Sequence, residues 1–108
     1  MTFYHNPAKN MMQLSIPGDL LSTNADQFRV TAHSMMEAYP PGNLECQGVE
    51  VNLENAHMVD SAGLNALIGL LRKLKNDSRR MVIRVADPHV HRVLLFTRMD
   101  KQAEIIKA

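Results

Sequence analysis

Apolar and polar residues alternate near the start of the chain. Met12, Leu14 and Ile16 have the two-residue period of a half-buried β-strand. A shorter strand is predicted to begin at Phe3-Tyr4, and the residues between the two strands, Asn6 to Asn10, are rich in turn formers. The pattern therefore predicts an opening β-hairpin.

Three further strands are predicted downstream. Val49, Val51 and Leu53 alternate with polar neighbours and indicate a central strand. The run Met81–Val85 is mostly apolar, which suits the interior of a sheet. Ile105-Ile106 indicates a last, short strand.

Between the hairpin and the central strand, the apolar residues recur with the period of a helix. Thr23 followed by Asp26 resembles a capping box, with Asp in place of Glu, and predicts where this helix begins. The loop from Tyr39 to Gln47 holds two prolines and a glycine, which end it. Its predicted inward positions are Ala25, Phe28, Ala32, Met35 and Tyr39.

Two more helices follow. The residues from Glu54 to Asp60 form a short connection, after which a helix is predicted from Ser61, its N-cap, to about Asn76. Asp87-Pro88 is a typical helix start, with Asp as the cap and Pro at the first helical position. The predicted inward positions are Leu64, Leu67, Ile68, Leu71 and Leu74 in the first of these helices, and Val90, Val93, Leu94 and Thr97 in the second.

The order of elements predicts an α/β fold. Strands that alternate with helices indicate parallel βαβ units with right-handed crossovers, and the hairpin adds an antiparallel edge. We therefore expect one domain over residues 1–108, a mixed sheet packed with helices. The methionine pairs Met11-Met12 and Met35-Met36 lie at core spacing, which favours packing over a binding surface.

Composition narrows the class of protein. Apolar residues make up 45% of the 108 residues, as in ordinary globular domains, and the net charge of +1 gives no strong field toward nucleic acid or membranes. The single cysteine, Cys46, cannot form an internal disulfide, which fits a reducing compartment. The N-terminus lacks the pattern of a signal peptide, and no apolar run reaches the roughly 20 residues of a membrane span. We expect a cytoplasmic protein.

The segment before the second helix carries the candidate chemistry. Ser61 by itself is adequately explained as a helix cap. Gly63 removes a side chain from the first turn, so another backbone or a phosphate can come close. Local chemistry alone does not raise Ser61 above a structural role.

The wider sequence pattern does indicate a functional role for Ser61. Asp60-Ser61-Ala62-Gly63-Leu64 resembles the Asp-Ser-x-Gly-Leu signature of the STAS domain, the fold of bacterial anti-sigma-factor antagonists. The resemblance covers essentially the whole chain: Ile16–Leu20 is similar to the Gly-Glu-Leu stretch of that family, and the strand and helix order around the motif matches. Leu21 departs from the family, which often has an acidic residue there. The chain also ends just after the last strand, where many relatives carry another helix.

The resemblance implies a partner switch. Ser61 would be phosphorylated by a partner that is both the anti-sigma factor and a serine kinase of histidine-kinase-like ATPase fold. The unphosphorylated domain would bind this partner, phosphorylation would end the binding, and a phosphatase would restore it. The resemblance implies that the partner is bound by Asp60, Ser61, Ala62 and Gly63 with Asp19, Ser22 and Thr23 from the earlier loop.

Two other functions remain open. A STAS scaffold or transporter-associated subunit would dock a partner through the same loop without phosphorylation. A small-ligand or nucleotide sensor would use the anion affinity of helix N-termini.

Enzymatic, metal and nucleic-acid functions are disfavoured. Ser61 lacks a Gly-x-Ser-x-Gly elbow, and His57 with Asp60 is no triad on sequence proximity alone. His89 and His91 point to different helix faces, with no ligand set around them, and no cofactor is implied. The basic residues Arg72, Lys73, Lys75, Arg79, Arg80 and Arg84 are interpreted as a solvated helix face rather than a nucleic-acid site.

Overall fold

Strands and helices follow one another in the order that the periodicity predicts. The computed structural model describes all of residues 1–108. A short 3-10 turn, η1, is the one element that the pattern did not predict. The strands are β1 (Thr2–Asn6), β2 (Met11–Ser15), β3 (Gly48–Leu53), β4 (Arg80–Val85) and β5 (Glu104–Lys107), and the helices are α1 (Ala25–Ala38), α2 (Ser61–Asn76), α3 (Pro88–Phe96) and η1 (Met99–Lys101).

The five strands form one mixed sheet in the order β1-β2-β3-β4-β5. β1 and β2 pair antiparallel, and every later pair is parallel. In this register Val51 lies beside Leu14 on one side and Ile83 on the other, so the predicted alternating residues share one face. The predicted α/β fold is confirmed.

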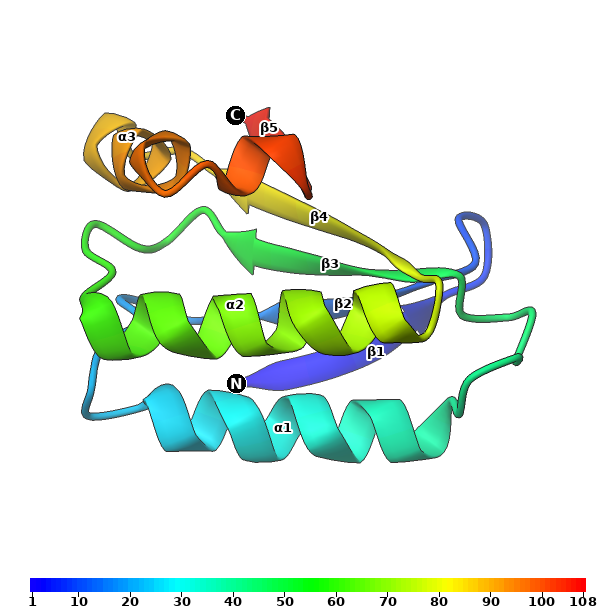
Figure 1. Ribbon diagram of the computed structural model, residues 1–108. Helices are drawn as coiled ribbons and strands as arrows, with labels where there is room; N and C mark the ends of the chain where they lie inside the picture. The colour runs from blue at the N-terminus through cyan, green and yellow to red at the C-terminus, as the bar shows by residue number, and fades with distance from the viewer.

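The helices cover that face. Because successive parallel strands are added in one direction, right-handed crossovers place α1, α2 and α3 on the same side of the sheet. Figure 1 shows α1 and α2 lying side by side along the sheet, with α3 beside its β4–β5 end. The core of 27 residues fills the space between these layers and includes both Met35 and Met36, as predicted. Met11 is equally buried, at 2% exposure.

The opposite face of the sheet carries a polar network. Glu50 in β3 is only 4% exposed, and its carboxylate accepts a hydrogen bond from Gln13. Arg84 in β4 donates to Glu54 at 2.7 Å and lies 3.9 Å from Glu50. Arg84 therefore belongs to a sheet face, not to the solvated helix face predicted for the basic stretch.

Arg79 departs further from that prediction. It is 7% exposed, and its guanidinium donates to the Pro40 carbonyl and lies 3.8 Å from the Met36 sulfur. Arg79 thus ties the end of α1 to the start of β4. Arg72, Lys73 and Lys75 on α2 are exposed as predicted.

The buried stripe of α2 is rotated from the predicted one. Leu67, Leu71 and Leu74 are buried, but Leu64 and Ile68 are only half-buried. Ala66 and Leu70 are buried in their place because α1 packs along that side of α2. The helix thus faces both the sheet and its neighbouring helix, which the period alone does not reveal.

Smaller corrections concern helix ends. The N-cap of α1 is Asn24, not Thr23, and the Asn24 side chain makes no cap bond because its Oδ1 accepts from the Leu21 N–H at 2.8 Å. Tyr39 lies just past α1, half-buried, with its ring stacked on His5. Val93 is half-buried. Thr97, predicted to face inward, is exposed beyond the end of α3.

The two glycines of α2 differ in what surrounds them. A Cβ built on Gly63 would lie 2.2 Å from the Leu20 carbonyl oxygen, whereas a Cβ on Gly69 would meet nothing within 4 Å. Gly63 therefore has a packing reason inside the molecule: the β2–α1 backbone presses against the first turn of α2.

We predict opposite effects for alanine at these two positions. Gly63→Ala should lower the free energy of unfolding by roughly 1–3 kcal/mol, since the Leu20 backbone must move. Gly69→Ala should raise it by up to about 1 kcal/mol, because alanine favours the helix and meets no neighbour. Urea unfolding measures both, and a Gly63→Ala protein as stable as the native one would contradict the close approach.

Candidate functional site

The predicted site lies at the carboxyl edge of the parallel strands. The β2–α1, β3–α2 and β4–α3 connections all meet at this edge, at the left in Figure 1. In open α/β sheets this edge is where binding sites commonly form, because loops rather than packed side chains line it. The residues predicted for the site come from the first two of these connections and from the first turn of α2.

Asp60, not Ser61, is the N-cap of α2. Asp60 has an extended backbone, and its carboxylate accepts a hydrogen bond from the Gly63 N–H at 2.8 Å. The predicted cap was wrong by one residue because Asp60 reaches the third amide of the helix while Ser61 already has helical geometry. Ser61 is the first residue of α2, and its side chain is exposed.

The second oxygen of Asp60 holds the other loop. Oδ2 accepts from the Ser22 N–H at 2.8 Å, so one carboxylate bridges the β2–α1 loop and α2. The Gly63 N–H, and after it the Ser22 N–H, lower the pKa of Asp60 because both bonds favour the ionised form. A negative charge is thereby fixed beside Ser61.

Asp19 joins the same two loops further in. Its Oδ1 accepts from the N–H groups of His57 at 2.7 Å and Met58 at 3.1 Å. The backbones also pair, since Leu20 and Val59 form a parallel bridge. The two loops are therefore tied to each other and to the start of α2.

A histidine–aspartate pair links the third loop. His57 Nδ1 lies 3.0 Å from Asp87 Oδ2, while the other oxygen of Asp87 caps α3, as predicted, by accepting from the His89 N–H. The bond to Asp87 raises the pKa of His57, and the bond to His57 lowers the pKa of Asp87. The sequence analysis missed this pair, since 30 residues separate His57 from Asp87 and the residues around one give no sign of the other.

This pair does not make a catalytic triad. No hydrogen bond joins His57 to the Ser61 hydroxyl, so Ser61 lacks the adjacent base that a serine nucleophile needs. No group of three or more His, Cys, Asp or Glu side chains is placed to hold a metal ion. None of the helices is both long and apolar enough to cross a membrane.

The structure brings most of the predicted partner-binding residues together. Asp60, Ser61, Ala62 and Gly63 form the start of α2, with Gly63 buried and Ala62 half-buried. Asp19 and Ser22 are joined to this segment by the bonds described above. Thr23 is exposed on the same loop without a side-chain bond to the site, and Leu21, the departure from the family pattern, is half-buried.

Asp60 generates a prediction about pH. A carboxylate whose pKa is lowered by folding stabilises the fold above its unfolded value, near 3.8, and this contribution is lost as the pH falls through the folded pKa. Asp60→Asn should therefore be less stable than the native protein at pH 7. The difference should shrink steadily below pH 4.

Urea midpoints of the two proteins across this range measure the effect. Glu37→Gln, which removes an exposed carboxylate that bonds no backbone amide, is the control and should show a smaller difference at pH 7. A stability difference between Asp60→Asn and the native protein that does not change with pH would rule out the charge as the cause.

Known proteins share this fold. Solved structures similar to the chain include an anti-sigma factor antagonist from Mycobacterium paratuberculosis, with TM-score 0.76, 17% identity, and coverage of 97% of this chain and 84% of that one. Two more are structures of the anti-sigma factor antagonist SpoIIAA. Its unphosphorylated form has TM-score 0.69 and 17% identity, with coverage of 99% of this chain and 89% of that one. Its phosphorylated form, described as a Bacillus cell fate determinant, has TM-score 0.69 and 18% identity, with coverage of 99% of this chain and 91% of that one.

At these identities the structural likeness establishes the fold. No curated protein sequence matches this chain. The family model of the STAS domain matches residues 6–107, nearly the whole length. Anti-sigma factor antagonists of this family are binding proteins without enzymatic activity. The chain belongs to the STAS domain family.

Proposed function

We propose that this protein is a phosphoregulated anti-sigma-factor antagonist that acts in the cytoplasm. In its unphosphorylated form it binds an anti-sigma factor that is also a serine kinase of histidine-kinase-like ATPase fold. Phosphorylation of Ser61 by that partner ends the binding, and a phosphatase restores it. The observation that carries the proposal is an exposed serine at the first position of α2, directly after a carboxylate held in its ionised form.

Accessibility supports Ser61 as the phosphoacceptor. Ser61 and Ser22 are both exposed at this edge, but the Ser22 N–H is fixed by Asp60 in a loop, whereas Ser61 begins a helix. The helix dipole favours an anion at the N-terminus of α2, although the Gly63 N–H there is already bound by Asp60. A phosphate there leaves the fold intact.

The electrostatics of the site support release. A phosphate adds about −1.5 to −2 charges at neutral pH. It would stand beside Asp60, whose pKa is lowered, with Asp19 and Asp87 on the adjoining loops. Burying this cluster against a partner requires desolvating several like charges, which disfavours docking.

The proposal predicts that Ser61 is the modified residue. Incubation with ATP and the kinase encoded by a neighbouring gene should add one phosphoryl group to the native protein and none to Ser61→Ala. Ser22→Ala, the nearest exposed serine, is the matched control and should still be modified. Intact-mass spectrometry reads the result, and a Ser61→Ala protein that still gains phosphate would overturn the assignment.

The second prediction concerns affinity. Ser61→Asp should bind the same partner at least about tenfold more weakly than the native protein, because it adds charge to the interface. Ser61→Asn has nearly the same shape without the charge and should bind like Ser61→Ala. Calorimetry with the purified partner measures this. Equal affinities of the Ser61→Asp and Ser61→Asn variants would exclude a charge switch. They would favour instead a STAS scaffold that docks its partner without phosphorylation.

A further inference from the structure

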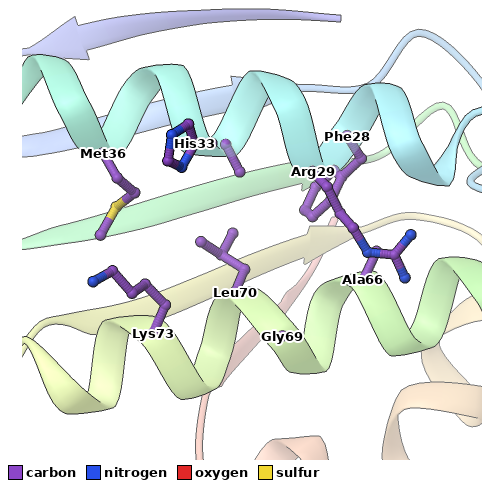
Figure 2. A pocket seen from close by; sticks show the side chains of 9 residues that line it. Phe28, Arg29, His33, Met36, Ala66, Gly69, Leu70 and Lys73 are labelled. Carbon is purple, nitrogen blue, oxygen red and sulfur yellow. The ribbon is translucent and has the colours of Figure 1, made fainter.

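A groove between α1 and α2 lies apart from the Ser61 loop. Its floor is apolar and its volume is about 250 Å³. Figure 2 shows Met36 and the Phe28 ring extending from α1 toward α2, with Leu70 extending from α2 between them, while Gly69 presents no side chain. The groove is lined by Phe28, Arg29, Ala32, His33, Met36, Ala66, Gly69, Leu70 and Lys73.

Gly69 leaves this groove open, but glycine lowers the stability of a helix. Glycine is the least favourable residue after proline inside a helix, so its presence in the middle of α2 needs a reason. Gly63 has one in the nearby Leu20 backbone, but a Cβ on Gly69 would meet nothing within 4 Å. No contact within the chain requires a glycine there, which indicates space kept for something outside it.

The size of the groove points to a protein side chain. Small-molecule sites commonly enclose roughly 300–1,000 Å³, and this groove is smaller than that range. It does suffice for one or two large apolar side chains. Such anchors in small pockets are typical of the centres of protein interfaces.

The charges around the groove indicate what flanks that anchor. Its charged lining residues are Arg29, Lys73 and, when protonated, His33, and no carboxylate lines it. In Figure 2 Arg29 stands at one end and Lys73 at the other, with His33 between them. From Arg29 to Met36 the groove runs for about 10 Å, two helical turns. Cations spread along both walls match several carboxylates on one segment better than the single head of a fatty acid.

The cations already have weak partners. Arg29 meets Asp26 at 2.9 Å, His33 meets Glu37 at 2.7 Å, and Lys73 lies 3.8 Å from Asp77. The two pairs of α1 are exposed on both sides, where ion pairs contribute little stability and are readily exchanged. Lys73 is itself 57% exposed and only loosely paired, although Asp77, the C-cap of α2, is 8% exposed. Carboxylates of a docked segment can therefore compete for the same cations.

We propose that the α1–α2 groove docks an acidic amphipathic helix of a partner protein. One apolar side chain of that helix enters beside Gly69, and its flanking carboxylates meet Arg29 and Lys73. This interface is additional to the Ser61 loop and does not depend on phosphorylation.

A synthetic peptide tests the proposal. The probe is an amphipathic peptide of roughly 16 residues, with leucines on one helical face and glutamates around them. Titrated into the isotope-labelled full chain, it should shift the amide resonances that line the groove. A peptide with lysine in place of glutamate should bind at least tenfold more weakly. No shifts at millimolar peptide, shifts elsewhere, or equal binding of the lysine peptide would overturn the proposal.

Variants then locate the contact. Gly69→Leu places a side chain in the groove, where its Cβ meets nothing within 4 Å, and should weaken peptide binding at least tenfold. Asn65→Leu, on the same helix but not among the lining residues, should bind normally. Lys73→Glu should weaken binding while its neighbour Arg72→Glu does not. Lys73 is 57% exposed, so this pair tests the charges even if Gly69→Leu folds poorly. Native binding by both groove variants, or shifts by decanoate but not by peptide, would refute protein docking here.

Discussion

The close contact between the Leu20 carbonyl and the first turn of α2 is the constraint on which the site depends. The carbonyl accepts the Asp60 N–H at 3.2 Å and occupies the space that a side chain at position 63 would need. Only glycine permits this approach. Once the two backbones are this close, the Asp60 carboxylate can span them and reach the Ser22 amide. The exposure of Ser61 follows, since the helix starts where the contact fixes it.

The same contact sets how the site responds to added charge. An isolated carboxylate next to a new phosphate relieves the repulsion by taking up a proton, because a like charge raises its pKa. Asp60 resists this, since two backbone N–H groups favour its ionised form. The charge of a phosphate on Ser61 therefore adds to a charge that stays in place. Its effect falls on the surface that meets a partner and not on the fold.

The acidic edge and the α1–α2 groove differ in sign, and that difference separates what each can bind. A segment rich in carboxylates is attracted to the groove, where the lining charges of Arg29 and Lys73 are positive, and repelled by the edge that carries Asp19, Asp60 and Asp87. Both surfaces belong to α2, whose first turn lies at the edge and whose middle borders the groove. A rigid helix thus presents two surfaces of opposite charge within a few turns.

The sequence by itself determined the five strands, the three α-helices and their order, because alternation and helical period depend on neighbours only a few residues apart. It also identified Asp87 as the N-cap of α3, whose cap bonds are local. Only the tertiary structure decided that Leu70 rather than Leu64 is buried, since the packing of α1 beside α2 selects the face. It alone decided that Asp60 meets Ser22, 38 residues away. Contacts at that separation depend on how the strands align, and no local pattern encodes their alignment.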